Sequence, residues 1–498
     1  MAPSTHTSPP RPAPVWLGLD VGTQSVRCVA TDRTGAVVAS ASRPLRSHRE
    51  GRRHEQDPQQ WWSALTAACA EAMATVGTRP VRGLSLCATS GTILLADTEL
   101  RPLTPALMYD DARAGNEVSR VHAAGAALWE RLGYRPQASW ALPKTLWLLR
   151  HHPPTNRTRL LHQADYLTGR LAGRLTAVDS SHALKTGYDL DGECWPADVV
   201  DALDLPPRLL PDVVRPGTPI GEVCATAAEA TGIPAGTPIV AGMTDGCASV
   251  LGSGTFSVGS WNSVLGTTLV LKGVTDRRLH DPLGVVYSHR APDGNWLPGG
   301  ASSVGAGVLS DLFGSADLDR LTALAVDRPQ STLVTYPLVS RGERFPFVAA
   351  EARRFTLGTP ADDVDAYAAV LRGVAFVERL CFDYLDLLGA PIDGTLTTTG
   401  GGARNDHWTR LRATTLGRPL TVPSDADPAV GMALLARSAE SSLAEAAQET
   451  VRDTVTVDPV PADGDVLTEG YLALVDALRE RGWLPTELAD HAHHRSTR

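Results

Sequence analysis

The sequence lacks the features of a membrane protein and of a disulfide-bonded protein. No run approaches the roughly 18 consecutive apolar residues that a membrane-spanning helix needs, and the start, MAPSTHTSPPRPAP, has no apolar block of the kind found in a signal peptide. The seven cysteines are scattered without a C-x-x-C pair, which argues against a disulfide framework or a structural zinc site. A cytoplasmic location is therefore expected.

The chain also lacks an excess of basic residues. It has 46 Lys and Arg residues against 55 Asp and Glu residues, a formal net charge of −9, so there is no electrostatic footprint for nucleic acid or an anionic membrane. We expect small molecules as partners, and neither nucleic acid nor membrane. The oligomeric state is left open, with a homodimer as one expectation.

The length predicts more than one domain. At 498 residues the chain is several times longer than a single-core domain, so two or more domains with a cleft are expected. We expect a disordered tail over 1–14, a first domain over 15–258, a second domain over 259–486, and a flexible tail over 487–498.

Strand and helix patterns alternate in the first half. Apolar runs at 15–19, 26–31 and 36–39 predict a β-meander, with Asp20 where the first strand meets its turn. A helix follows, with Asp57 as N-cap and Pro58 at its first position. A strand at 81–87 then opens into a Thr-Ser-Gly turn, and 93–96 is expected as its hairpin partner. This alternation predicts an α/β domain with a mixed sheet, in which ligands bind at strand ends.

The second half repeats the scheme. A strand at 238–241 reaches Asp245 and a small-residue helix, and strands at 261–265 and 269–272 flank the turn Gly266-Thr267-Thr268. The recurrence of strand, Gly-Thr turn and strand suggests two related domains that meet near 254–262. A long helix is expected over 362–388, and a strand at 395–399 precedes the turn Gly400-Gly401-Gly402 and a further helix.

These turns carry the parts that phosphoryl transfer from ATP requires: backbone donors for phosphate, a carboxylate for Mg²⁺, and a base for the attacking hydroxyl. The glycine turn opens a helix, which favours phosphate, yet it matches neither G-x-x-x-x-G-K-[ST] nor G-x-G-x-x-G. Asp245 either caps its helix or accepts the hydroxyl proton. Considered alone, the Asp20 turn is also consistent with an ordinary hairpin end, and Gly266-Thr267-Thr268 is also consistent with a plain β-turn.

Together, DVGTQSVR at 20–27, TDG at 244–246, GTT at 266–268 and GGGARNDHW at 400–408 resemble the FGGY carbohydrate kinases, over roughly 15–485. The resemblance implies two ribonuclease-H-like domains of the actin and hexokinase type, with sugar and ATP meeting in the cleft between them, and Mg²⁺ as cofactor. It implies that the domain over 15–258 binds the sugar and carries the catalytic aspartate, and that the domain over 259–486 binds ATP. It implies Asp245 as the catalytic base and Asp20 and Asp245 as metal ligands. The implied sugar contacts are Asp20, Gln24, Ser25, Arg27, Ser90 and Asp245, and the implied nucleotide contacts are Thr23, Gly266, Thr267, Thr268, Gly300, Gly401, Gly402, Ala403 and Asn405.

The sugar end departs from one group in the family. Xylulokinases of the family usually carry Met-His-Gly where this chain has Thr89-Ser90-Gly91, and MYDDARA at 108–114 is more similar to a group related to D-ribulose kinases. The resemblance therefore favours D-ribulose as substrate, with D-xylulose or another pentulose or polyol as the alternative. Asp110 and Asp111 are either further sugar contacts or solvated loop residues.

Two hypotheses from other classes stay open. In the first, the chain is a non-catalytic sugar- or nucleotide-binding module that kept the fold and lost the reaction. In the second, it is an ATPase of the same superfold that acts on proteins. The presence of Asp20, Asp245 and both Gly-Thr turns speaks against the first, and the lack of an evident peptide-binding appendage speaks against the second.

Overall fold

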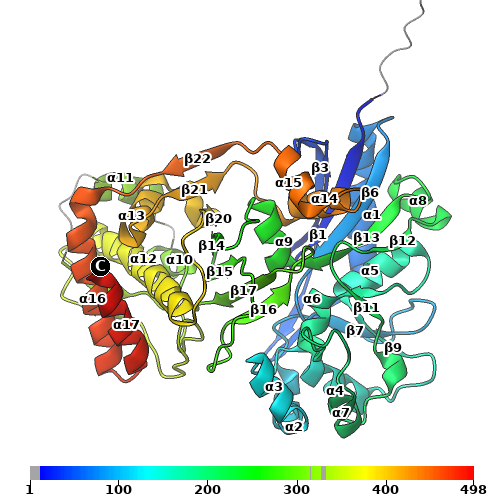
Figure 1. Cartoon of the computed structure of the whole chain (residues 1–498), viewed down its shortest axis with the longest axis horizontal. Helices are drawn as coiled ribbons and strands as arrows, with labels where there is room; N and C mark the ends of the chain where they lie inside the picture. Colours follow the sequence, from blue (N-terminus) through cyan, green and yellow to red (C-terminus); the bar gives the residue numbers. More distant parts are fainter. Residues whose placement is uncertain (1–11, 315, 327–331, 498) are drawn as a thin grey trace, which may run out of the picture.

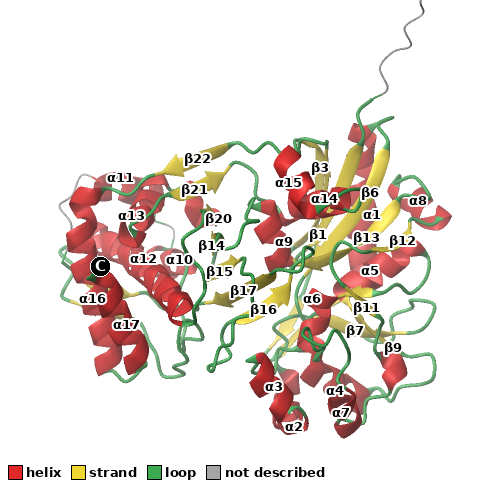
Figure 2. Ribbon diagram, in the orientation of Figure 1, coloured by secondary structure: helices red, strands yellow, loops and turns green. Residues whose placement is uncertain are grey.

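The computed structural model describes residues 12–314, 316–326 and 332–497. Most of the tail expected over 1–14 lies outside the described residues. The chain forms two α/β domains side by side, each built on a mixed sheet with its own hydrophobic core (Figure 1, Figure 2). Within the described ranges, no helix combines the length and hydropathy that crossing a bilayer requires.

The first domain contains a six-stranded sheet of order β12-β13-β6-β1-β2-β3. Strands β1, β6 and β13 run parallel, whereas β2, β3 and β12 run antiparallel to their neighbours. The bounds are β1 Val15–Val21, β2 Ser25–Thr31, β3 Val37–Pro44, β6 Val81–Ala88, β12 Pro219–Glu222 and β13 Pro238–Thr244. The predicted meander is thus confirmed.

The second domain contains a seven-stranded sheet of order β16-β17-β15-β14-β20-β21-β22. Its strands are β14 Trp261–Leu265, β15 Leu269–Gly273, β16 Tyr287–Arg290, β17 Trp296–Ala301, β20 Leu396–Thr399, β21 Leu420–Pro423 and β22 Thr454–Val457. Apart from the edge strand β16, this order and the strand directions match those of the first sheet, with β14 in the place of β1 and β20 in the place of β6. The duplication expected from two Gly-Thr turns is therefore a duplication of whole sheets.

Helices cover both faces of the first sheet. On one face, α1 packs on β2 and β3 and contacts α5 and α8, whereas α14 lies on the other face against β1, β6 and α9. Asp57 caps α1 by accepting a hydrogen bond from the Gln59 N–H at 2.9 Å, as the sequence predicts. The helices of the first domain are α1 Pro58–Val76, α2 Val118–Ala124, α3 Ala126–Leu132, α4 Ala141–His151, α5 Gln163–Ala172, α6 Ser180–Ala183, α7 Ala197–Ala202, α8 Ala225–Thr231 and α9 Asp245–Gly252.

The remaining helices are α10 Gly307–Phe313, α11 Leu318–Val326, α12 Asp363–Leu387, α13 Asp406–Leu416, α14 Pro428–Ser438, α15 Leu443–Glu449, α16 Gly464–Glu480 and α17 Thr486–Ser496. The flexible tail expected over 487–498 is wrong for most of its length, because α17 buries Leu488, Ala489 and Ala492 and packs against α12 and α16. The many polar residues of this segment suggested a tail, although its three apolar residues lie at helical spacing and form one buried face.

Helix α14 packs on a different domain from the strand that precedes it in sequence. It follows β21 of the second sheet but packs on the first, so closely that a Cβ atom on Gly18 of β1 would lie 1.7 Å from the Ala429 carbonyl oxygen. Only glycine permits this approach. The predicted domain limits, 15–258 and 259–486, thus describe the order along the chain, while packing places α14 on the first domain.

Three smaller sheets complete the fold. One has the order β4-β5-β8-β7-β9, and the other two pair β10 with β11 and β18 with β19. The hairpin expected between 81–87 and 93–96 is wrong, since β7 pairs with β8 and β9 and not with β6. The bounds are β4 His48–Glu50, β5 Arg53–Gln56, β7 Ile93–Ala96, β8 Ala106–Leu107, β9 Arg159–His162, β10 Val178–Asp179, β11 Val213–Val214, β18 Val334–Tyr336 and β19 Phe355–Leu357.

Candidate active site

Two of the predicted acids lie at one edge of the first sheet. In the parallel register Asp20 of β1 is level with Cys87 of β6, and Cys87 is level with Met243 of β13. Asp245 directly follows Thr244, the last residue of β13. Because the three strands run parallel, their carboxyl ends meet at this edge, which is where ligands bind in such sheets.

Asp20 is a partly exposed carboxyl in a crowded acidic setting. Burial, together with the negative charges of Asp427 and Asp245, raises its pKa to about 7. The Cys87 thiol donates to Asp20 Oδ1 at 3.4 Å. Near neutral pH the free protein therefore holds this carboxyl between its two protonation states.

Asp245 is the first residue of α9, with Thr244 as N-cap. Its Oδ1 accepts a hydrogen bond from the Gly246 N–H at 2.7 Å, which satisfies one N–H of the first turn, although Asp245 is not itself the N-cap considered from the sequence. Burial raises its pKa, whereas the positive charges of Lys185, His182 and Lys272 lower it. Lys272 lies on β15, so side chains of both domains act on this carboxylate.

Asp427 is a third acid that the sequence reasoning missed. It is the N-cap of α14, accepts from the Ala429 N–H at 2.8 Å, and forms an ion pair with Arg27. The only sequence signal was the pair Asp427-Pro428, which is typical of a helix start, and no local pattern shows that this helix packs on the first sheet. Arg27, predicted as a sugar contact, is therefore engaged with Asp427 in the described structure.

The predicted sugar turn is held from several sides. Thr89 bonds through its N–H and its hydroxyl to Gln163 Oε1, at 3.2 and 2.7 Å. The ammonium group of Lys144 donates to the Gly91 carbonyl at 2.5 Å, and that of Lys185 donates to the Ser90 carbonyl at 3.3 Å. Among the described residues the buried Ser90 hydroxyl has no hydrogen-bond partner, so it remains available to a ligand.

A buried hydrogen-bond chain supports the end of β13. The Ser181 hydroxyl accepts from the Thr244 N–H at 2.8 Å, and Asp179 accepts from the Ser181 hydroxyl at 2.6 Å. His182 Nδ1 lies 2.6 Å from Asp179 Oδ2. Burial lowers the pKa of His182, but the Asp179 carboxylate outweighs this effect and leaves that pKa above its ordinary value.

The two loop acids differ in their surroundings. Asp111 is fully buried and accepts hydrogen bonds from the His54 N–H and from Arg113, so it organises the fold. Asp110 pairs with Arg49 at 2.9 Å and with His54. Neither carboxylate is a merely solvated loop group, and Asp111 is closed off by its partners.

On the second sheet the two Gly-containing turns meet. Gly400 has φ +88°, and a Cβ atom there would lie 2.6 Å from the Leu265 carbonyl oxygen, directly before the turn at 266–268. Thr267 is exposed in that turn, whereas Gly266 and Thr268 are partly buried. A Cβ on Gly401 would meet no atom within 4 Å. The pair of turns thus presents open backbone, as a nucleotide site requires.

Other predicted nucleotide contacts are engaged in packing. Gly300 lies within β17, where a Cβ would lie 2.5 Å from the Phe345 ring, and Ala403 is buried. The Asn405 amide caps α13 by accepting from Trp408 N–H at 2.9 Å and donates to the Thr322 hydroxyl at 3.0 Å. Gly402 packs on the Leu265 side chain. These residues shape the turn rather than present free polar groups.

The first Gly-Thr turn is fixed through its backbone. The Thr23 carbonyl accepts from Gln56 Nε2 at 2.7 Å and the Gln24 carbonyl accepts from the Leu45 N–H at 2.7 Å. The Gln24 side chain is exposed and Ser25, which begins β2, is partly buried. These residues therefore stand beside Asp20 on a rigid turn.

Sequence reasoning overlooked the lysines. Lysine occurs only three times in the chain, at 144, 185 and 272, and all three lie beside this site. Against 46 basic residues in total, this scarcity was a readable signal. Lys144 is buried, and that burial lowers its pKa to about 7.

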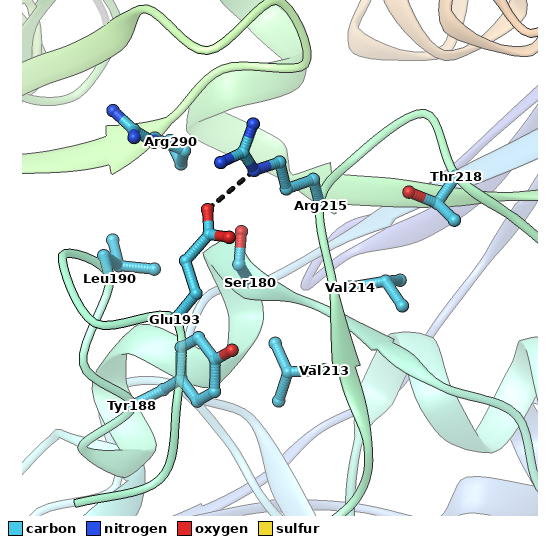
Figure 3. A pocket seen from close by; sticks show the side chains of 9 residues that line it. All are labelled: Ser180, Tyr188, Leu190, Glu193, Val213, Val214, Arg215, Thr218 and Arg290. Carbon is cyan, nitrogen blue, oxygen red and sulfur yellow. Dashed lines mark hydrogen bonds and ion pairs between the residues drawn. The ribbon is translucent and has the colours of Figure 1, made fainter.

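A separate pocket of about 300 Å³ lies between the domains (Figure 3). Ser180, beside the supporting Ser181, lines it together with Arg215 and Arg290, and Arg215 pairs with Glu193 at 2.6 Å. None of the predicted site residues lines this pocket. It is therefore distinct from the site around Asp245.

The fold and the site define a two-domain carbohydrate kinase, and comparison with known proteins agrees. The model of the FGGY carbohydrate kinase N-terminal domain matches residues 15–252, and that of the C-terminal domain matches 261–440. The chain belongs to this family and is an ATP-dependent sugar kinase that uses Mg²⁺.

The chain is similar to curated relatives over most of its length. It is 32% identical to a xylulose kinase of Streptomyces coelicolor, covering 82% of this chain and 84% of the relative. It is 31% identical to a xylulose kinase of Streptomyces rubiginosus, covering 94% and 98%. A solved kinase structure from Brucella ovis superposes with a TM-score of 0.86 at 27% identity, covering 94% of this chain and 99% of that one.

The donor set fits Mg²⁺ in the way typical of nucleotide enzymes. Among the described residues no three His, Cys, Asp or Glu side chains form a metal cage. Asp20 and Asp245 offer two carboxylates whose charges repel each other, and Mg²⁺ commonly takes one or two carboxylates together with phosphate oxygens and water. Bound Mg²⁺ would neutralise that repulsion.

Proposed function

We propose that the chain phosphorylates a ketopentose, and that D-xylulose is the better supported substrate. The observation that carries this choice is the similarity to proteins named xylulose kinase, at 32% and 31% identity over most of both chains. The sequence favoured D-ribulose because of the Thr-Ser-Gly turn, and the comparisons support the alternative. Ser90 remains the proposed sugar contact, because its hydroxyl is buried and without a partner in the described structure.

We further propose Asp245 as the base that accepts the proton of the attacking hydroxyl. Support comes from its raised pKa, which brings a carboxylate closer to the range in which a general base works at neutral pH. Its position at the strand ends, beside Ser90 and Asp20, also supports this role. Because the base acts in its ionised form, kcat/KM should rise with pH through that raised pKa.

Roles for the other residues follow from which of their polar groups are free to contact a ligand. Asp20 would share Mg²⁺ and the sugar with Asp245, and Gln24, Ser25 and Thr23 flank it. The exposed Thr267 and the backbone of Gly401 would receive the nucleotide phosphates. For Gly300, Ala403 and Asn405 we propose a supporting role in the fold, since their side chains or Cα atoms are packed.

An ADP-release assay over four ketopentoses and glycerol tests the substrate. We expect the highest kcat/KM with D-xylulose, and lower values with D-ribulose, L-ribulose, L-xylulose and glycerol. A preference for D-ribulose would reverse the choice and restore the interpretation drawn from the Thr-Ser-Gly turn. ADP release that needs no sugar would instead favour an ATPase. We also expect a cytoplasmic protein, and a homodimer stays a proposal that light scattering can test.

A further inference from the structure

The three lysines of this chain lie near the candidate active site, and none of them is paired with a carboxylate in the described structure. Among the described residues, none of the three lysines has a carboxylate within 4.0 Å, whereas many arginines form such ion pairs. Lys272 is only 7% exposed. Because a buried ammonium group is costly unless an anion accompanies it, an unpaired lysine here points to an anionic ligand.

Two of these lysines approach one ring from different domains. Lys185 belongs to the short helix η2, Leu184–Thr186, and Lys272 to β15. Their ammonium nitrogens lie 5.8 and 5.9 Å from the centre of the Tyr287 ring. Lys272 Nζ also lies 2.9 Å from His289 Nδ1. Burial and the charge of Lys272 lower the pKa of His289, so that ring is neutral and accepts a hydrogen bond from Lys272.

The same two charges act on the proposed base. Both are among the groups that favour the ionised form of Asp245, and Lys185 is fixed near the sugar turn by its bond to the Ser90 carbonyl. Lys144, the third lysine, is fully buried against the Gly91 and Met108 carbonyls. Only Lys185 and Lys272 are therefore placed for a ligand beside Asp245.

We propose that Lys185 and Lys272 form an oxyanion-binding site beside Asp245, and that its ligand is the phosphoryl group in transfer. This rests on the proposed function, in which a ketopentose is phosphorylated with Asp245 as the base. Transfer breaks the bond between the terminal phosphorus and the ADP oxygen and forms one to the sugar oxygen, whose proton passes to Asp245. Negative charge then lies on three phosphoryl oxygens. An ammonium group is a compact charge with three rotatable donors, suited to such a moving group.

The variants Lys185→Met and Lys272→Met test the site, with Lys185→Arg and Lys272→Arg to restore charge. We expect each Met variant to lower kcat about 10²- to 10³-fold, as loss of one charge-stabilising donor does, with the sugar KM within about threefold. The Arg variants should recover part of kcat. The melting temperature of Lys272→Met should not fall, because an unpaired buried charge is removed. Arg341→Met, at an exposed ion pair, is the matched control.

A second readout needs no turnover. Without nucleotide, inorganic phosphate should raise the melting temperature of the wild type, and the two Met variants should lose this effect while Arg341→Met keeps it. Phosphate stabilisation that is unchanged in folded Met variants would overturn the proposal, as would kcat within threefold of the wild type.

A comparison of sugar substrates distinguishes the phosphoryl group from the other possible oxyanion, a carboxylate on the substrate. If the wild type prefers D-gluconate to D-xylulose and Lys185→Met removes that preference, the lysines hold a substrate carboxylate and the phosphoryl assignment is wrong. If no sugar is phosphorylated but phosphate binding depends on both lysines, the anion site stands and the proposed function fails.

Discussion

Replacing Asp20 by Asn should make the protein more stable and less active, and the gain in stability should depend on pH. A carboxyl with a pKa of about 7 in the folded protein, against its ordinary 3.8, binds more protons folded than unfolded between these values. Wild-type stability therefore falls as pH rises through this window. At about 1.36 kcal/mol for each pKa unit, the full cost approaches about 4 kcal/mol at pH 8, and screening of a partly exposed group reduces it to about 1–3 kcal/mol.

Calorimetric melting temperatures at pH 8 and pH 4.5 measure this directly. For a domain of this size, about 1–3 kcal/mol corresponds to roughly 2–8 °C. Asp20→Asn should melt higher than the wild type by that amount at pH 8, and the gap should shrink to about a quarter at pH 4.5, where Asp20 is protonated in the folded protein but mostly ionised in the unfolded chain. Asp458→Asn, at an exposed residue, should show no gap at either pH. A variant that melts lower at pH 8, or a gap equal at both pH values, refutes the reasoning.

Four further substitutions separate packing from binding. Gly400→Ala should lower the melting temperature, because the φ of +88° and the nearby Leu265 carbonyl leave no room for a Cβ atom. At Gly401 a Cβ atom meets open space, so Gly401→Ala should change only the KM for ATP. Equal melting temperatures for the two variants would contradict this. Ser90→Ala should keep stability, since its hydroxyl is unpartnered in the described structure, and raise the sugar KM about 3- to 10-fold in initial-rate assays; an unchanged KM would remove Ser90 from the site. Lys144→Met should release the Gly91 and Met108 carbonyls and raise the sugar KM but not the ATP KM, so equal changes in both would argue against its hold on the sugar turn.

The sequence predicted those parts of the fold that local patterns determine. Asp57 and Pro58 mark a helix start through capping, and the repeated Gly-Thr hairpins revealed the duplication, because each is a strand-turn-strand unit complete within a few residues. The catalytic candidates Asp20 and Asp245 were found because each ends a recognisable strand.

What the sequence could not show depends on contacts between distant segments. Asp427 reaches Asp20 only because α14 crosses back to the first sheet, and no local pattern of 428–438 specifies that partner. Likewise, Asn405 fits a nucleotide motif, yet its amide is used to cap α13. The tail at 487–498 was misjudged because its polar composition outweighs three buried residues.

The central claim is that Asp245 takes the proton of the attacking hydroxyl, and single-turnover phosphoryl transfer by Asp245→Asn tests it most directly. With D-xylulose and MgATP saturating, we predict a rate about 10² to 10⁴ below the wild type, while the Kd for MgADP, measured by calorimetry, stays within about threefold. A transfer rate within tenfold of the wild type would contradict the claim.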